Sequence, residues 1–284
     1  MTADPGDEVV TAVELYRFYR AAGEETLALR GVSLRVCGGE MVAVAGPSGS
    51  GKSTLLACLA GLDEPDGGMV RVHGEALSHR PETARARLRA DHIGVLFQQD
   101  NLFEHLTVAQ NVRLVRRLVA PARRVPVPDL LSRLGLAAVA DSYPSSLSGG
   151  ETARAGLAVA LANDPAVVLA DEPTGELDPA SEHAVLELLR AWCRRGAAVL
   201  VASHSPAVRA RADRVIERAR RGGGDTLCVA HGHLLRVLTA RWLGLPPVAG
   251  RLFLLEAGSV GVLGWELDWP AVEAWNLRGW RNGN

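Results

Sequence analysis

A glycine-rich run near the start of the chain limits the folds that this sequence can adopt. The run is Gly46-Pro47-Ser48-Gly49-Ser50-Gly51-Lys52-Ser53, and Thr54 follows it. An apolar segment, Glu40–Ala45, precedes the run, and a segment with a helical pattern, Ser53–Ala60, continues it. Glycines let backbone N–H groups close around phosphate oxygens, and the start of a helix favours negative charge. The spacing therefore predicts a phosphate-binding loop between a buried strand and a helix.

Lys52 stands out from the composition of the whole chain. It is the only lysine among 31 basic residues, so the other 30 are arginines. A compact ammonium group suits the inside of a phosphate loop, whereas the wide guanidinium fork of arginine does not. We therefore expect Lys52 to reach the β- and γ-phosphates of a nucleotide and the Ser53 hydroxyl to hold Mg²⁺.

Two adjacent carboxylates end another apolar segment, Val167–Ala170. They are Asp171 and Glu172. If that segment is a strand beside the phosphate loop, Asp171 can hold Mg²⁺ through water, and Glu172 can polarise the attacking water as a general base. Paired acids at a strand end are more often solvated or helix-capping. This interpretation therefore depends on the complete phosphate loop elsewhere in the chain.

The apolar pattern along the chain predicts one large α/β domain. Strand-like segments alternate with segments of helical spacing, which indicates parallel strands with helices on both faces of a sheet. The expected strands are 9–19, 27–36, 40–45, 92–97, 167–170 and 198–202, and the expected helices are 53–60, 107–119, 130–136, 150–162 and 179–194. We expect residues 1–8 to form a flexible N-terminus and 9–218 to form this domain, with a helical subdomain at about 100–160.

Composition limits the compartment and the partners. The chain is 48% hydrophobic and 22% charged, with a formal net charge of −1. No global field attracts nucleic acid, and no nucleic-acid partner is expected. The apolar runs are strand-length, the first residues lack a signal-peptide core, and four scattered cysteines suit a reducing compartment. A cytoplasmic location is predicted.

Further motifs resemble those of the ATP-binding subunits of ABC transporters. The run Leu147-Ser148-Gly149-Gly150-Glu151 looks like the signature motif of that family, although glutamine is commoner than Glu151 at its end. Four other positions match in the family's order, with Tyr19 for the aromatic residue that stacks on adenine, Gln98 for the glutamine loop, Gly175–Asp178 for the D-loop and His204 for the switch histidine. The resemblance covers about residues 9–208. Within the superfamily it is strongest to the lipoprotein-release and macrolide-export branch.

This resemblance implies a fold, ligands and partners. The fold is a P-loop NTPase of the ABC ATPase type with a helical signature subdomain, and the ligands are ATP and Mg²⁺. Gln98 would contact Mg²⁺ or the attacking water, and His204 the γ-phosphate. The Ser148 hydroxyl and the next two backbone amides would bind ATP held by a second ATPase subunit, identical or paralogous. The other partner is an integral membrane permease at the inner face of the cell membrane. Tyr16 remains an alternative to Tyr19.

The segment 219–284 resembles a different family. Five of the six tryptophans follow the glycine-rich stretch Arg220–Gly224, and Asp225–Arg236 is similar to the C-terminal part of histidine phosphatases. In that family a histidine matching His231 lines the phosphate pocket, opposite a nucleophilic histidine in an Arg-His-Gly motif. This sequence has no Arg-His dipeptide, so we expect a partial α/β segment without catalysis. Two alternatives stay open, a soluble ABC ATPase without a transporter and a histidine phosphatase or mutase.

Overall fold

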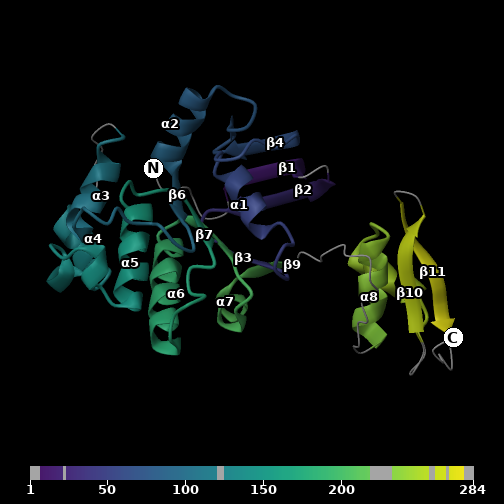
Figure 1. The fold of residues 1–284 in the computed structure, drawn as a ribbon. Helices are drawn as coiled ribbons and strands as arrows, with labels where there is room; N and C mark the ends of the chain where they lie inside the picture. The colour runs from purple at the N-terminus through teal and green to yellow at the C-terminus, as the bar shows by residue number, and fades with distance from the viewer. Residues whose placement is uncertain are drawn as a thin grey trace. The chain divides into compact units, whose positions relative to one another are not determined.

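A parallel sheet carries the phosphate loop. Among the described residues its strands are β3 (Met41–Ala45), β6 (Ile93–Leu96), β7 (Val167–Asp171), β8 (Ala198–Ala202) and β9 (Arg214–Glu217), in the spatial order β6-β7-β8-β3-β9. The structure is a computed structural model that describes residues 7–21, 24–119, 125–217, 232–255, 260–266 and 269–277. The sheet belongs to the first of two units, Met1–Arg221 and Gly222–Asn284 (Figure 1).

This sheet is buried on both faces, because its central strands consist almost entirely of apolar residues. Alternate residues of β3 enter different cores, with Met41 and Ala43 in one and Val42 and Val44 in the other. The first core also contains residues of α3 (Val108–Arg116), α4 (Val127–Arg133), α5 (Gly149–Ala160), α6 (Pro179–Cys193) and α7 (Pro206–Arg211). The second contains residues of α1 (Lys52–Leu59) and of a second sheet. The expected layering of helices on a parallel sheet is thus present.

The second sheet is antiparallel. Its strands are β1 (Glu8–Ala21), β2 (Glu24–Cys37), β4 (Gly67–Val72) and β5 (Glu75–Ala76), in the order β2-β1-β4-β5. The sequence predicted the first two of these strands but neither β4 nor the helix α2 (Glu82–His92). Only Leu88 of α2 is buried, so this charged helix has no apolar stripe that a sequence pattern could reveal.

Helices α3, α4 and α5 lie together at one side of the first unit (Figure 1). They fall within the expected helical subdomain. Helix α4 begins at Val127, three residues before its predicted start, with Pro128 in its first turn. Proline is tolerated there because the first N–H groups of a helix have no partner within it. Pro128 therefore lies inside the start of the helix and not before it.

The second unit contains one helix and a pair of strands in its described part. These are α8 (Gly232–Trp242), a 3₁₀ turn η3 (Pro247–Leu252), β10 (Val260–Glu266) and β11 (Trp269–Leu277). Arg236 Nε donates to the carbonyl of Gly250 at 3.2 Å and ties α8 to the turn. His231 lies outside the described residues. In the described part of the chain, no helix combines the length and apolarity needed to cross a bilayer.

Candidate active site

The predicted site residues of the parallel sheet follow neighbouring strands. The phosphate loop follows β3, Asp171 ends β7 and Glu172 follows it, His204 follows β8, and Gln98 follows β6. The carboxyl ends of parallel strands meet at one edge of a sheet, where ligands of open α/β folds bind. At this edge Glu172 Oε1 lies 3.0 Å from His204 Nδ1 and 4.0 Å from Lys52 Nζ. The structure thus brings together the predicted base, switch histidine and phosphate-loop lysine.

The phosphate loop closes around the ammonium group of Lys52. That group donates to the carbonyls of Gly46, at 2.8 Å, and Pro47, at 3.2 Å, and the side chain is 8% exposed. The turn Pro47–Ser50 is closed by a backbone hydrogen bond of 3.2 Å. Gly51 then takes a left-handed conformation, with φ of 81°, and begins α1 without a side-chain cap. The first N–H groups of α1 are therefore available to an anion.

Asp171 and Ser53 form a donor set at the same edge. The Oδ1 atom of Asp171 is buried and has no hydrogen-bond partner among the residues that the structure describes. Burial raises the pKa of this carboxyl, the nearby Ser53 hydroxyl lowers it by hydrogen bonding, and the charge of Glu172 raises it further. A buried carboxylate oxygen beside a hydroxyl suits a hard cation that takes oxygen ligands. The residues present therefore fit Mg²⁺.

Glu172 has a strained backbone and a well-held side chain. Its φ is 44°, a left-handed conformation that costs roughly 1–2 kcal/mol for a residue with a side chain. Its N–H donates to the carbonyl of Ala202 at 2.8 Å, and its Oε2 accepts from the Ser203 hydroxyl at 2.8 Å. The Glu172 side chain is 14% exposed and that of His204 is 72% exposed. Strain maintained by several contacts is typical of functional positions.

The predicted glutamine-loop residue Gln98 follows β6, and the predicted D-loop, Gly175–Asp178, lies between β7 and α6. Gln98 is exposed, whereas its neighbour Gln99 donates to Glu176 Oε1 at 3.1 Å and so joins the two loops. Asp178 caps α6, because its side chain accepts the backbone N–H groups two and three residues ahead, at 2.9 and 3.1 Å. The predicted D-loop aspartate is therefore the N-cap of a helix in its own chain.

The signature run occupies the start of α5. Leu147 ends the preceding 3₁₀ turn η2 (Pro144–Ser146) and packs against the first core, and Ser148 is the N-cap of the helix. The Ser148 hydroxyl donates to Glu151 Oε2 at 2.7 Å, and the same oxygen accepts the Ser148 N–H at 2.9 Å. These bonds lower the pKa of Glu151. Glutamate serves this capping box as well as glutamine does, which explains the departure at the end of the motif.

Gly150 is buried where α5 meets α6. A Cβ atom at this position would lie 2.6 Å from Ser181 Oγ and 3.2 Å from Ser181 Cβ, so rotating the hydroxyl would relieve the closer contact but leave Ser181 Cβ tight against the new methyl group. We expect Gly150→Ala to lower the free energy of unfolding by about 1–3 kcal/mol, as overpacking does. Gly149→Ala is the matched control, because its Cβ would lie 3.9 Å from Leu177. Urea denaturation measures both, and equal stability of the two variants would contradict the expectation.

Tyr19, rather than Tyr16, lies next to the phosphate loop. Its hydroxyl donates to Asp63 Oδ2 at 2.6 Å and hydrogen-bonds with Thr54. The guanidinium of Arg17 lies over the Tyr19 ring, 4.9 Å from its centroid, and also binds Asp63. Tyr16 instead packs against glycines of β2 and β4. The geometry favours Tyr19 over Tyr16 as the aromatic residue of the nucleotide site.

Sequence reasoning missed several polar residues around this site. Arg17 and Asp63 hold Tyr19, and Ser203 holds Glu172. Ser203 directly precedes the predicted switch histidine, which is the one sequence signal that could have drawn attention to it. The partners of Arg17 lie more than forty residues away in the sequence, so no local pattern connects them.

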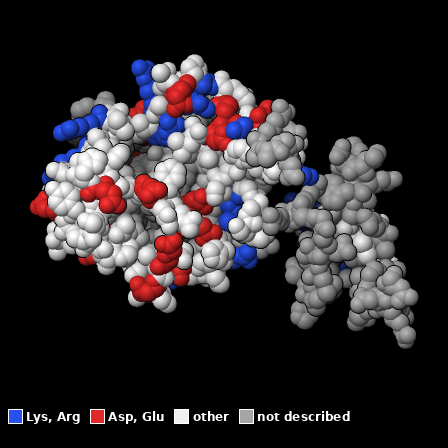
Figure 2. All heavy atoms as spheres, in the orientation of Figure 1, with Lys and Arg blue, Asp and Glu red and all other residues white. Residues whose placement is uncertain are grey.

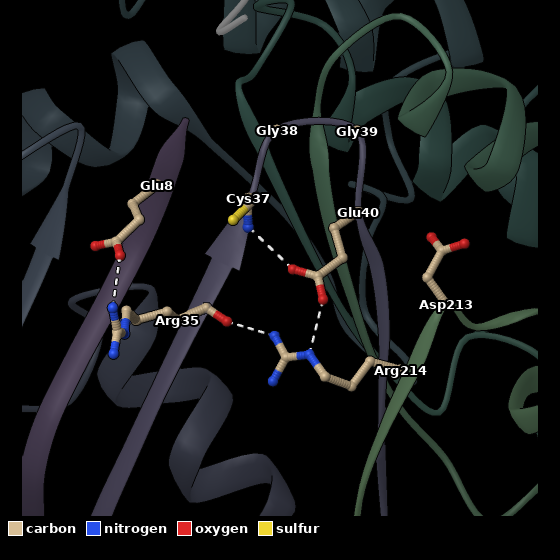
Figure 3. A pocket seen from close by; sticks show the side chains of 8 residues that line it. All are labelled: Glu8, Arg35, Cys37, Gly38, Gly39, Glu40, Asp213 and Arg214. Atoms are coloured by element: carbon tan, nitrogen blue, oxygen red, sulfur yellow. Dashed lines mark hydrogen bonds and ion pairs between the residues drawn. The ribbon is translucent and has the colours of Figure 1, made fainter. Parts of the chain in front are cut away.

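A hollow of about 610 Å³ lies at the other end of β3, away from the phosphate loop (Figure 3). Its lining residues are Glu8, Arg35, Cys37, Gly38, Gly39, Glu40, Asp213 and Arg214. Arg214 pairs with Glu40 at 2.7 Å, and Arg35 pairs with Glu8 at 2.9 Å. Because it lies at the opposite end of β3 from the phosphate loop, this hollow is separate from the candidate site.

Two family models match the sequence. The model described as ABC transporter matches residues 29–175, and the one described as histidine phosphatase superfamily (branch 1) matches residues 176–278. In the structure, residues 176–217 build α6, β8, α7 and β9 of the first unit. Strand β8 lies between β7 and β3, so it is an integral part of the parallel sheet. The second match therefore begins inside the first unit and continues into the second.

Curated relatives include the macrolide export ATP-binding/permease proteins MacB of Shigella flexneri and Escherichia coli (strain K12). They are 43% and 42% identical to this chain over 207 residues, which is 72% of this chain and 32% of each relative. The chain thus spans about a third of the length of these relatives.

Solved structures include dimers of MJ0796, a bacterial ABC transporter cassette. One dimer superposes with a TM-score of 0.68 at 32% identity and covers 74% of this chain and 94% of that chain. A post-hydrolysis dimer bound to ADP and Pi gives 0.69 at 31% identity and covers 75% and 97%. The expected P-loop NTPase fold with a partial histidine-phosphatase-like segment after it is confirmed. The chain belongs to the ABC transporter family and contains the ATP-binding cassette of that family.

Proposed function

We propose that this chain is an ATP-hydrolysing subunit that powers a transporter. The observation that carries the proposal is the arrangement of Lys52, Glu172 and His204 at one sheet edge, beside the uncapped start of α1. At this edge Lys52 provides positive charge for the phosphates of a nucleotide, and the neighbouring Glu172 carboxylate can accept a proton from water. The cassette dimers that share this fold, one of them bound to ADP and Pi, support the same activity here.

ATP binding uses groups that are already in place. The Lys52 ammonium exchanges its two loop carbonyls for β- and γ-phosphate oxygens, and the N–H groups of α1 bind the same phosphates. Arg17 covers one face of the Tyr19 ring, and adenine stacks on the other. Ser53 and Asp171 would hold Mg²⁺, and Gln98, which follows the neighbouring strand β6, would be a further ligand. When bound there, the cation would supply positive charge that offsets the charge of the β- and γ-phosphates.

Hydrolysis then needs a base and a stabiliser. Glu172 accepts a proton from water while the water oxygen bonds to the γ-phosphorus, and the bond to the β,γ-bridging oxygen breaks with its electron pair leaving on ADP. His204 contacts the γ-phosphate. A second ATPase subunit, identical or paralogous, places its Ser148 hydroxyl and the following amides against the same phosphate. ATP binding therefore drives dimerisation of two cassettes.

The transporter role extends to a membrane partner. We infer an integral membrane permease, with this chain peripheral on the inner face of the cell membrane. The curated relatives are named as ATP-binding/permease proteins, which supports this partner. Phe103 and Tyr143, near α3 and α5, are 56% and 51% exposed and offer apolar contact surface.

Figure 2 shows acidic and basic side chains close to one another on the face that it draws, which favours a protein partner over nucleic acid.

The purified full chain is expected to hydrolyse ATP when Mg²⁺ is present and to stop when EDTA removes it. Phosphate release measures this activity, with Asp171→Asn as the variant that weakens the cation site.

Co-purification with a membrane permease would support the transporter role. Stimulation by RNA or DNA would instead favour a soluble ABC ATPase. Turnover of p-nitrophenyl phosphate would contradict our inference that the second unit is catalytically inactive.

A further inference from the structure

A series of hydrogen bonds runs from Glu172 to the starts of α6 and α7. The Ser203 hydroxyl donates to Glu172 Oε2 at 2.8 Å and accepts the Ser205 N–H at 3.1 Å. The Ser205 hydroxyl donates to Glu182 Oε1 at 2.7 Å, and the Thr174 hydroxyl donates to the same oxygen at 3.0 Å. This network connects the loop after β7, the loop after β8 and the first turn of α6.

Ser203 lies at the centre of the network and is 1% exposed. Its N–H donates at 3.1 Å to the carbonyl of Val44, two residues before the phosphate loop. Its side chain is therefore fixed relative to three strands, β3, β7 and β8. A buried hydroxyl that donates to a carboxylate makes a charge-assisted hydrogen bond, which is stronger than one between neutral groups.

The two oxygens of the Glu172 carboxylate have different surroundings. Oε2 accepts from Ser203, whereas Oε1 faces His204 at 3.0 Å and Lys52 at 4.0 Å. Holding Oε2 in place directs Oε1 toward the phosphate loop. Oε1 is thus the oxygen in position to receive the proton of the attacking water.

We propose that Ser203 is a positioning residue for Glu172, and that Glu182 anchors the segment that carries Ser203 and His204. Glu182 is half-buried in the first turn of α6, where a carboxylate is favoured by the helix dipole. One of its oxygens holds hydroxyls from the two loops that carry Glu172 and His204. The inference rests on the proposed function, because it assigns both residues to ATP hydrolysis.

Ser203→Ala in the full chain tests the proposal. The turnover number for ATP is expected to fall about tenfold to hundredfold, the range for a hydrogen bond to a charged group, while KM and the affinity for a fluorescent ATP analogue stay within about twofold. Ser203→Thr keeps the hydroxyl and is expected to restore most of the turnover. Ser33→Ala is the matched control, because the Ser33 hydroxyl donates to Glu14 at 3.3 Å in the antiparallel sheet, outside the site.

Glu182 supplies a second test that does not depend on the folding of the Ser203 variants. Glu182→Ala is expected to lower turnover by about tenfold, and Glu182→Gln, which keeps one acceptor oxygen, by less. Three results would each overturn this inference while leaving the proposed function in place. The first is equal turnover in Ser203→Ala and Ser33→Ala, and the second is a Ser203→Thr variant as slow as Ser203→Ala. The third is wild-type turnover in Glu182→Ala. Failure of the wild-type chain to hydrolyse ATP with Mg²⁺ would overturn the proposed function and the inference together.

Discussion

Replacing Glu172 with glutamine is expected to leave ATP binding intact and to lower hydrolysis by roughly two to four orders of magnitude, the contribution of a positioned general base. Glutamine keeps the shape of the side chain and an oxygen that accepts from Ser203, but it cannot take a proton from water. ATP therefore binds and is not consumed. Phosphate release measures the loss of turnover, and a fluorescent ATP analogue measures binding.

The same variant is expected to accumulate as a dimer in ATP, because the nucleotide that joins two cassettes persists. Size-exclusion chromatography with light scattering, with and without ATP, gives the mass of the particle. Glu75→Gln is the matched control, since Glu75 lies in β5 of the antiparallel sheet and pairs with Arg80 at 2.6 Å, away from the strand ends that carry the site. A folded Glu172→Gln chain that stays monomeric in ATP would sink the two-subunit site. Repeating the assay without residues 219–284 shows whether the second unit hinders dimerisation.

Lys52→Ala is expected to abolish measurable ATP binding, with Kd raised about a hundredfold or more, which corresponds to roughly 2.7 kcal/mol. The ammonium group is the buried cation of the loop, and it is held there by carbonyls that a phosphate would replace. Lys52→Arg is expected to bind weakly too, because the guanidinium fork is wider than the loop that holds an ammonium group. Calorimetric titration with ATP measures both variants, and thermal melting checks that each one is folded.

The composition of the chain offers a direct check on this role. Lys52 is the only lysine, so a lysine-selective acylating reagent can modify this side chain and the N-terminal amine alone. ATP with Mg²⁺ is expected to protect Lys52 and to leave the N-terminal amine reactive, which mass spectrometry of the digested chain resolves. Equal labelling of Lys52 with and without nucleotide would count against its contact with phosphate.

Local sequence was sufficient for most of the parallel sheet. The segment from β3 through the phosphate loop to α1 is contiguous, and its apolar strand, glycines and helical pattern each indicate the structure found. Helix α2 was missed because it buries only Leu88, and apolar periodicity is the signal on which such predictions rest. The expected helix at 130–136 started three residues late, because Pro128 lies in the first turn of α4, where proline is tolerated.

The candidate site was predictable where a motif has its own spacing, and less so where contacts cross the sheet. Ser203 meets Glu172 because Asp171 pairs with Ala202 in the register of β7 and β8. Register between strands about thirty residues apart is set by tertiary packing, which a single sequence does not display. The same holds for Glu182, whose partners Thr174 and Ser205 lie on two different loops.

The place of β8 in the sheet also has a consequence for biosynthesis. While the ribosome has released only the residues before 198, the nascent chain contains β3 and β7 but not the strand that pairs with both of them. The edges of β3 and β7 that pair with β8 then remain open, and exposed edges promote association with other chains. The strand that joins β7 to β3 lies within the segment matched by the histidine phosphatase model. Chaperone demand during translation should therefore last until that segment has emerged.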